Sequence, residues 1–434
     1  MKQLTRACLM LLLFVCAASA LRAQSYSYCT NDNRFTQQVI YTANQVKMDT
    51  GIVYGRGVTW QNDTIDLKLN VHYPKPSLDT FQKHPFVMMV FGGAFRIGTR
   101  QTVDALCREF ARRGFVAASM DYRLGWDTTC ADSLSYIKAV YRAMQDLHAA
   151  LRFVVAHADT MRVDTAWLFA GGQSAGSGTV LGLVYSSQQE IDSIYPQLSV
   201  QLKKLNKADN TLTNKFTLKG IFNNWGSVED VFYDAADALP MVSFHGDADG
   251  VVNIDSAQEL NCFHPPLPWA LGSRALHNRL VSAGICSDLT VRHNGGHGVF
   301  TDSIGKSFRV GRAACFFKNL FCSSCVSGYR VTIEPDPQHT NCPDQAAMAR
   351  AAMTIITGTP EGFNCYPNPA TGTVSISGMD RASDFILSLS DAAGRLVLRA
   401  CNQATIDISQ LSRGIYILKF EQNGQTIVRK LVKE

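Results

Sequence analysis

The sequence predicts an α/β fold, with a mostly parallel sheet covered by helices, followed by a small all-β domain. Two observations carry this prediction. Continuous apolar runs alternate with helical stretches up to about residue 300, which is typical of parallel strands buried on both faces. From residue 365 onward, short segments of alternating apolar and polar residues lie between turn residues, as in a β-sandwich.

Composition places the chain among globular proteins and excludes two other classes. Apolar residues make up 46% of the chain and the mean hydropathy is −0.03, which excludes wholesale disorder and a polytopic membrane protein. The formal net charge of +5 is spread along the chain without a basic cluster, so no nucleic-acid partner is expected. The 13 cysteines are many for a cytosolic enzyme and ordinary for a secreted one.

Residues 1–23 are expected to be a secretory signal peptide. Lys2 and Arg6 form a basic start, an apolar run follows over residues 7–20, and cleavage is expected near Ala23. The apolar run is shorter than the roughly 20 residues that span a bilayer, so no transmembrane segment is expected. A lipoprotein that uses Cys16 is a minor alternative, because the residue before this cysteine is not small.

Residues 24–325 carry the alternating pattern and are expected to form the main domain. An antiparallel ribbon is expected over residues 51–73. The buried strands that follow are expected over residues 86–91, 115–120, 167–170, 218–222, 240–244 and 289–293. Helices are expected over residues 103–113, 135–157 and 254–260. Such sheets place their ligands at the carboxyl ends of the strands, so the residues just after each run are the first candidates.

The remainder of the chain divides into two further parts. Residues 326–364 contain several prolines and glycines with little periodicity, and are expected to form a linker or a loosely packed extension. Residues 365–434 are expected to form the small sandwich, in which Asn423-Gly424 predicts a hairpin between two alternating runs.

Three motifs of this C-terminal part resemble the C-terminal sorting domain of the type IX secretion system. They are Tyr-Pro-Asn-Pro at 366–369, Asp-Ala-Ala-Gly-Arg-Leu-Val at 391–397 and Leu-Ser-Arg-Gly-Ile-Tyr-Ile at 411–417. The resemblance implies that the type IX secretion machinery exports the chain across the outer membrane of a Gram-negative bacterium, to the cell surface or the medium, and that the tail is usually removed. An accessory carbohydrate-binding sandwich is the alternative.

A glycine-rich turn is predicted directly after the strand that ends at residue 170. Ser174 is the centre of the pentapeptide Gly-Gln-Ser-Ala-Gly at residues 172–176. This G-x-S-x-G pattern places a serine on a strained strand-to-helix turn with its hydroxyl exposed. The pattern alone also fits an ordinary glycine-rich turn, so the residues downstream have to decide.

A serine hydroxyl needs a neighbouring base, itself oriented by a carboxylate, before it can act as a nucleophile. Asp249 follows a predicted strand within His-Gly-Asp-Ala-Asp-Gly-Val-Val, and His297 lies between glycines after the last predicted strand. Asp247 or Asp255 stays open as the acid. The two other histidines of these segments, His245 and His293, are interpreted as structural side chains.

Along the chain the three residues come in the order Ser, Asp, His, which resembles the order in the α/β-hydrolase family. Further motifs resemble its carboxylesterase and hormone-sensitive-lipase-like branch. The resemblance covers roughly residues 70–300 and includes Ser-Met-Asp-Tyr-Arg-Leu at 119–124. It implies that Ser174, His297 and Asp249 are nucleophile, base and acid of a catalytic triad. Asp121 and Arg123 of the Ser-Met-Asp-Tyr-Arg-Leu motif are interpreted as a structural pair.

The reaction that this resemblance implies needs N–H groups that stabilise an oxyanion. Gly93 and Ala94 follow the first parallel strand, where related esterases carry an H-G-G-G-F loop, and the N–H of Ala175 completes the candidate set. The chain departs from that pattern, because Phe91 stands in place of the histidine and Ala94 in place of the third glycine. The loss of the histidine removes a hydrogen bond that helps to fix the loop.

The resemblance therefore implies a secreted serine esterase that acts on small esters or acylated polysaccharide, without a metal or an organic cofactor. Substrate choice is expected in residues 186–216 and at Trp225, which fits a core position equally well. One alternative is a peptidase of the prolyl-oligopeptidase type, although only about fifty mature residues precede the sheet, too few for the usual propeller. The other is an inactive hydrolase fold that serves as a surface binding protein.

The cysteines of the main domain are expected to form disulfides in an oxidising compartment, with their pairing left open. The candidates are Cys107, Cys130, Cys262, Cys286, Cys315, Cys322, Cys325 and Cys342. Zinc at Cys322-x-x-Cys325 is the minor alternative. Without the two cysteines of the signal peptide and the two of the C-terminal part, an odd number of the 13 remains, so at least one is unpaired or joined to another molecule.

Overall fold

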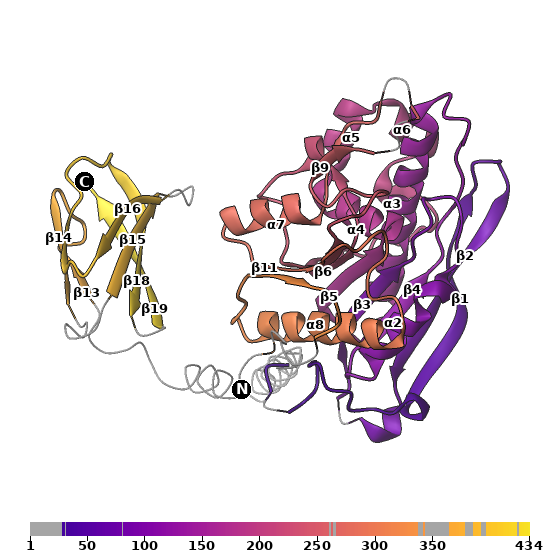
Figure 1. Cartoon of the computed structure of the whole chain (residues 1–434), viewed down its shortest axis with the longest axis horizontal. Coiled ribbons are helices and arrows are strands. Elements are labelled where there is room, and N and C mark those ends of the chain that lie inside the picture. The colour runs from indigo at the N-terminus through magenta and orange to yellow at the C-terminus, as the bar shows by residue number, and fades with distance from the viewer. Residues whose placement is uncertain are drawn as a thin grey trace, which may run out of the picture. The chain divides into compact units, whose positions relative to one another are not determined.

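The computed structural model describes residues 28–30, 32–79, 81–259, 262–263, 266–336, 342, 364–377, 385–391, 396–422 and 425–434. The chain divides into two compact units, Met1–Ala349 and Arg350–Glu434 (Figure 1). The predicted signal peptide lies outside the described residues.

A nine-stranded sheet forms the centre of the larger unit, in the order β1-β2-β4-β3-β5-β6-β8-β11-β12. The predicted antiparallel ribbon consists of β1 (Val46–Val58) and β2 (Thr64–Pro74), and β2 also pairs antiparallel with β4. All other neighbours pair in parallel. They are β3 (His84–Val90), β4 (Val116–Met120), β5 (Val163–Gln173), β6 (Leu218–Asn224), β8 (Met241–Gly246), β11 (Ser287–Arg292) and β12 (Gly328–Thr332).

Helices cover both faces of this sheet, which confirms the predicted fold class. α2 (Asp104–Ala111) and α8 (Ser303–Phe321) pack together on one face (Figure 1). α3 (Ser133–Ala156) and α4 (Ala175–Tyr185) pack together on the other. Every residue of β3 and β4 is buried, because helices lie against both faces, and this explains the continuous apolar runs. The described residues of this unit also form the α-helices α5 (Gln188–Ile194), α6 (Gln197–Leu202) and α7 (Ser273–Ser282).

Residues 254–259 do not form the helix that the sequence predicts over 254–260, and residue 260 lies outside the described residues. They contain β9 (Ser256–Gln258), which pairs with β10 (Trp269–Leu271), and β10 in turn pairs with β7 (Val228–Glu229) in a separate antiparallel sheet. Seven residues are too short a window to separate the two periodicities, and the cross-strand hydrogen bonds decide the outcome.

β12 lies in the segment expected to be a linker or an extension. It pairs in parallel with β11 and thereby adds the last strand to the sheet of the larger unit. Residues 337–341 and 343–363 of the same segment lie outside the described part of the chain.

The described residues contain four disulfides, so the expected disulfide framework is present. The pairs are Cys29–Cys322, Cys130–Cys262, Cys286–Cys325 and Cys315–Cys342. Both sulfurs of the alternative zinc motif are thus in disulfides, and no group of metal-binding side chains occurs elsewhere among the described residues.

Cys107 is unpaired, in contrast to its expected place in a disulfide. It lies on the core side of α2 with no exposed surface, so no other cysteine of the described residues bonds to it. Burial raises the pKa of its thiol well above the ordinary value. The odd cysteine count of the main domain is explained by this buried thiol.

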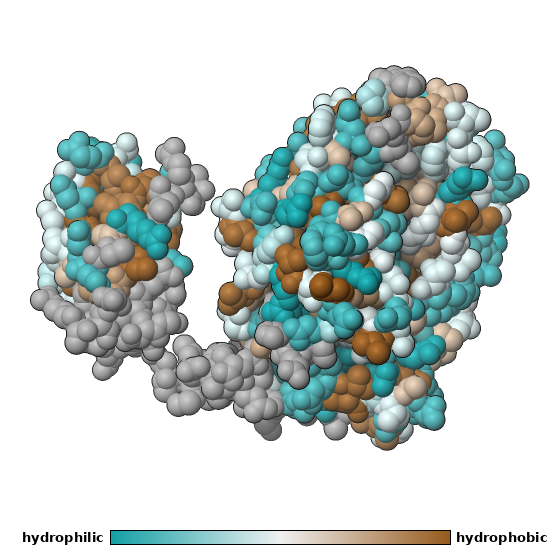
Figure 2. Space-filling view, viewed as in Figure 1, coloured by the Kyte–Doolittle hydropathy of each residue, from teal (hydrophilic) through white to brown (hydrophobic). Residues whose placement is uncertain are grey.

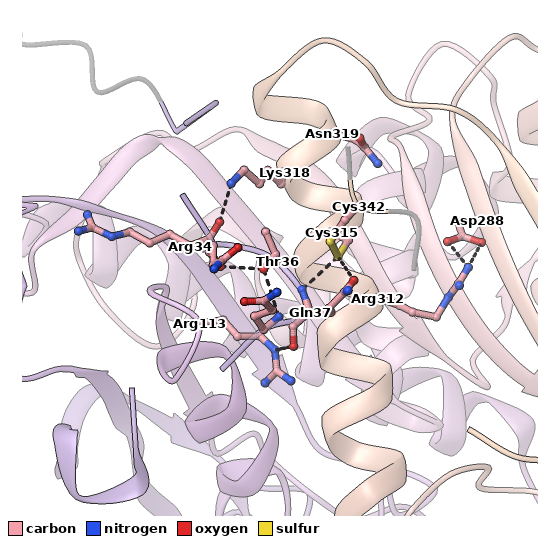
Figure 3. The surroundings of a disulfide bond; sticks show 12 residues. Arg34, Thr36, Gln37, Arg113, Asp288, Arg312, Cys315, Lys318, Asn319 and Cys342 are labelled. Carbon is pink, nitrogen blue, oxygen red and sulfur yellow. Dashed lines mark hydrogen bonds and ion pairs between the residues drawn. A yellow bond between two sulfur atoms is a disulfide. The ribbon is translucent and has the colours of Figure 1, made fainter. Parts of the chain in front are cut away.

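The N-terminal segment is held against α8 close to the Cys315–Cys342 disulfide (Figure 3). Lys318 Nζ donates hydrogen bonds to Asp32 O at 2.7 Å and to Arg34 O at 2.9 Å. The Cys29–Cys322 disulfide joins the same two segments covalently. The segment before β1 is therefore tied to the C-terminal end of α8.

The smaller unit contains a three-stranded sheet, β13-β14-β17, and a four-stranded sheet, β16-β15-β18-β19. Their bounds are β13 (Asn364–Tyr366), β14 (Thr373–Ser377), β15 (Phe385–Asp391), β16 (Leu396–Cys401), β17 (Thr405–Asp407), β18 (Gly414–Gln422) and β19 (Gln425–Lys433). Val374 from one sheet and Leu387 and Leu418 from the other share one apolar cluster, as in a sandwich. β18 and β19 pair antiparallel, as the predicted hairpin requires, and Asn423-Gly424 lies outside the described residues.

No helix among the described residues combines the length and the apolarity needed to cross a membrane. On the face of the larger unit that Figure 2 shows, apolar residues are interspersed with polar ones.

Candidate active site

The loops that follow β3 and β5 meet at one point of the sheet edge. The chain passes from β3 to β4 on one side and returns to β5 on the other side, which creates a topological switch point. A Cβ atom added to Gly92 would lie 2.6 Å from Gln173 O, so only glycine permits this approach of the two loops.

Ser174 occupies the sharp turn between β5 and α4 with φ 51° and ψ −122°. A Cβ atom on Gly172 would lie 2.2 Å from the carbonyl carbon of Gly176, and one on Gly176 would lie 2.2 Å from Val90 O. The two glycines of the pentapeptide are therefore required where strand and helix approach each other. The positive φ holds the serine side chain out at the end of the strand.

The structure brings Ser174, His297 and Asp249 together from the ends of three parallel strands. His297 Nε2 lies 2.8 Å from Ser174 Oγ, and His297 Nδ1 lies 2.8 Å from Asp249 Oδ2. His297 lies in the loop between β11 and α8, and Asp249 lies in the loop after β8. The three side chains form one continuous hydrogen-bonded chain.

Asp249 is held as an acceptor of several hydrogen bonds. Its Oδ1 accepts from Val251 N at 2.8 Å and from Val252 N at 3.0 Å. Burial by itself would raise the pKa of Asp249, but the hydrogen bonds from His245, His297 and the backbone outweigh burial and hold the pKa well below its usual range. The carboxylate is thus ionised beside the imidazole.

The two other acids that the sequence left open lie elsewhere. Asp247 Oδ2 pairs with His293 Nδ1 at 2.9 Å, and Asp255 forms an ion pair with Arg274. His297 has neither of them among its partners.

His245 supports Asp249 and is fully buried. Its Nε2 lies 3.2 Å from Asp249 Oδ2 and 3.0 Å from Val252 O, and its Nδ1 lies 2.7 Å from Ser273 Oγ. The sequence predicted a structural histidine here without its contact to the carboxylate, because periodicity does not indicate what a strand-end side chain touches.

The loop of Gly93 and Ala94 bends sharply beside Ser174. Gly93 has φ 127° and Ala94 has φ 52°, and a Cβ atom on Gly93 would lie 1.9 Å from Ile97 O. Trp126 Nε1 donates to Ala94 O at 2.8 Å and so fixes the orientation of that peptide group. Ala175 is the first residue of α4, and its N–H has no acceptor within the helix.

Phe91 is anchored by an aromatic neighbour in place of the missing histidine. Its ring stacks on Tyr122 with the centroids 4.3 Å apart, and the Tyr122 hydroxyl donates to Phe91 O at 3.0 Å. Both residues are buried. A stacked pair and one hydrogen bond thus fix the start of the loop.

A cavity of about 130 Å³ lies beside Ser174, between α3, α4 and the small sheet. Its wall includes Phe95, Tyr136, Val140, Met144, Ser174, Ala175, Gly178, Gly182, Ser186, Val228, Glu229, Phe232, Val252, Glu259 and Leu267. Most of these side chains are apolar. Burial raises the pKa of the two acids, Glu229 and Glu259, which accept hydrogen bonds from the Tyr195 and Ser227 hydroxyls at 2.9 Å and 2.6 Å.

Two family comparisons identify the two units. Residues 69–229 match the BD-FAE family of esterases with an α/β-hydrolase-like fold, and residues 364–434 match the secretion system C-terminal sorting domain. The larger unit thus contains a BD-FAE domain, an α/β-hydrolase-like esterase domain. The C-terminal unit is a sorting domain of the type IX secretion system, which directs the hydrolase to the cell surface or the medium.

Solved structures of esterase 2 from the planctomycete Thermogutta terrifontis are similar to this hydrolase. The apo form is 19% identical, with coverage of 67% of this chain and 99% of the esterase and a TM-score of 0.44. The propionate-bound form is 19% identical, with coverage of 63% and 93% and a TM-score of 0.43. The form phosphorylated by paraoxon is 20% identical, with the same coverages and TM-score 0.43. The comparison with curated proteins returned no match.

Trp225 does not line the cavity of the hydrolase, contrary to its expected place in a substrate wall. It is 4% exposed, and its ring packs edge-on to His297 with the centroids 6.4 Å apart. Trp225 has φ 44°, and this turn directs the side chain into the protein. Of residues 186–216, Ser186 lies in the cavity wall, while α3 contributes Tyr136 and two apolar residues that the sequence did not single out.

Asp121 and Arg123 of the hydrolase do not pair with each other. Asp121 Oδ2 accepts from Arg100 Nη1 at 2.6 Å, whereas Arg123 pairs with Asp146 at 2.7 Å and Asp209 at 3.1 Å. The two side chains therefore have separate acidic or basic partners. Neither lines the cavity beside Ser174.

Proposed function

We propose that this secreted hydrolase cleaves carboxylic esters through an acyl-enzyme intermediate on Ser174. The observation that carries the proposal is the hydrogen-bonded chain from Ser174 Oγ through His297 to Asp249, with 2.8 Å at each contact. A serine hydroxyl in contact with a neutral imidazole that a carboxylate orients is an activated nucleophile.

In the first half of the reaction, Ser174 Oγ attacks the ester carbonyl carbon while His297 Nε2 takes its proton. The carbonyl oxygen becomes an oxyanion, and the N–H groups of Gly93, Ala94 and Ala175 are its proposed donors. Collapse of the tetrahedral intermediate breaks the bond to the alcohol oxygen, which leaves with the proton from His297. Water then attacks the acyl-enzyme in the same way and releases the acid.

Asp249 has two tasks in this proposal. Its Oδ2 accepts from His297 Nδ1, which leaves Nε2 free to accept the serine proton. Its negative charge also stabilises the imidazolium that forms. The hydrogen bonds from His245 and the backbone to Asp249 keep that carboxylate in place during both half-reactions.

The size of the cavity favours an ester substrate with a short acyl group. Its volume of about 130 Å³ is close to that of a cavity that holds a single small ring. The alcohol part is proposed to be either a small alcohol or a hydroxyl of a polysaccharide. Residues 1–23 are proposed to direct the chain to the inner-membrane secretion pathway before the sorting domain acts at the outer membrane.

The test is reaction with a fluorophosphonate probe, followed by identification of the modified peptide by mass spectrometry. We expect stoichiometric labelling of Ser174, because labelling requires an activated serine. A wild-type protein that is neither labelled nor active on esters would be the inactive binding protein instead. Preferential cleavage of a proline-containing peptide over an ester would favour the peptidase alternative.

Replacement of Tyr122 by phenylalanine is expected to loosen the oxyanion loop. The change removes the hydroxyl that donates to Phe91 O at 3.0 Å and leaves this buried carbonyl unsatisfied. We expect the free energy of unfolding to fall by about 1–2 kcal/mol and kcat for a short ester to fall by about tenfold. Thermal unfolding and steady-state kinetics measure the two effects.

The matched control is Tyr185→Phe, because the buried Tyr185 hydroxyl has no hydrogen-bond partner among the described residues. This variant should retain both the stability and the kcat of the wild type. Equal effects of Tyr122→Phe and Tyr185→Phe would contradict the role assigned to Tyr122.

A further inference from the structure

A buried arginine of α8 lies behind the residues that build the active site. Arg309 is 0% exposed, and among the described residues it has no carboxylate partner. Burial lowers the pKa of its guanidinium to about 9. A cation in this position is costly unless hydrogen bonds compensate it, so its contacts define its role.

The guanidinium contacts three segments of the site. Nη1 donates to Asn224 Oδ1 at 2.6 Å, at the end of β6, and Nε donates to Phe300 O at 3.1 Å, in the loop of the proposed base. With its amide oxygen toward Arg309, Gln173 accepts from both Nη atoms at 3.2 Å. Gln173 is the residue directly before the proposed nucleophile.

Two neighbours of Arg309, Asn224 and Trp225, extend the contact to the reacting side chains. Ser174 N donates to Asn224 O at 2.9 Å, so Asn224 holds the turn that carries the nucleophile. The guanidinium of Arg309 also lies 4.8 Å from the ring centroid of Trp225, which packs edge-on to His297. One planar group thus supports both partners of the 2.8 Å contact between serine and imidazole.

We propose that Arg309 is a positioning residue that sets the placement of Ser174 relative to His297. A guanidinium presents five donors in a fixed plane, whereas an ammonium is a point charge on a flexible stem and cannot keep the same set of partners. Arg309 does not line the cavity, so it acts on the chemical step and not on substrate binding. This inference rests on the proposed esterase function.

The experiment compares Arg309→Lys and Arg309→Met with the wild type in steady-state hydrolysis of a short p-nitrophenyl ester. Rates are referred to the folded fraction, which near-ultraviolet circular dichroism and the thermal midpoint report. We expect kcat to fall by about tenfold to a hundredfold in Arg309→Met, because a displacement of about 1 Å is worth that much. The lysine variant should recover part of this loss, and KM should stay near the wild-type value in both.

Arg312→Lys is the matched control. Arg312 lies on the same helix and is 1% exposed, but its partner is Asp288, at 2.6 Å (Figure 3). Its kcat should equal that of the wild type.

An active wild type whose Arg309→Lys and Arg309→Met variants keep the full kcat would overturn the positioning role alone. An equal loss of kcat in Arg312→Lys would overturn it as well, because the loss would then reflect α8 in general. A wild type that neither hydrolyses esters nor reacts with a fluorophosphonate would overturn the esterase function, and the inference with it.

Discussion

Replacement of Ser174 by alanine should lower ester hydrolysis by about 10⁴-fold or more. The change removes a single oxygen and with it the hydrogen bond to His297 Nε2 at 2.8 Å. The backbone at φ 51° is as strained for alanine as for serine, and the thermal midpoint should therefore stay close to that of the wild type. The measurement is kcat/KM on a short p-nitrophenyl ester.

Ser243→Ala provides the control for this variant. Ser243 is buried in β8, and its hydroxyl has no partner among the described residues, so the same chemical change should leave activity unaltered. A folded Ser174→Ala protein that keeps most of its activity would rule out Ser174 as the nucleophile.

Replacement of Asp249 by asparagine should reduce kcat by about 10⁴-fold, nearly as much as loss of the nucleophile. The amide no longer stabilises the imidazolium, and its N–H groups favour the imidazole tautomer that cannot accept the serine proton. Asp247→Asn is the control, because Asp247 pairs with His293 and should leave kcat unchanged. A large effect at Asp247 and a small one at Asp249 would reverse the assignment of the acid.

Asp249→Asn should also change the stability of the protein at acid pH. The pKa of Asp249 is lower in the folded protein than its unfolded value of about 4. Its ionisation therefore contributes stability that is present above the unfolded pKa and is lost as the pH falls toward the folded pKa. Unfolding measured from pH 6 downward should show a steeper loss of stability below about pH 4 in the wild type than in Asp249→Asn.

The fold class and the sorting domain were predictable because their signals are local and repeated. Buried parallel strands leave continuous apolar runs, and the loops that cross at β3 and β5 need glycines at Gly92, Gly172 and Gly176 because a Cβ atom would collide. Short sequence patterns record such backbone requirements directly. The candidate nucleophile, base and acid could be named in this way because each follows a strand end.

Side-chain direction was harder to predict. Trp225 follows β6 as expected, but its turn at φ 44° sends the ring inward toward Arg309 and away from the cavity. Cys107 and Cys130 lie in the segments before and after β4, yet α2 directs the Cys107 thiol into the core while Cys130 pairs with Cys262. Such outcomes depend on packing between elements distant in sequence, which no local spacing records.

The position of Arg309 could not be predicted from the sequence either. Helix α8 was not among the predicted helices, and the sequence around Arg309 has no pattern that distinguishes a buried positioning group from a surface charge. Its partners come from β5, β6 and the His297 loop, and only the assembled sheet brings those segments to one guanidinium.

The disulfides near the end of the hydrolase unit would stabilise the enzyme if the sorting domain were removed by proteolysis. Cys29–Cys322, Cys286–Cys325 and Cys315–Cys342 all close before the sorting domain begins. A proteolytic cut between residues 342 and 364 would leave every one of these bonds intact and both ends of the released enzyme fastened. These covalent links would limit fraying from the new terminus.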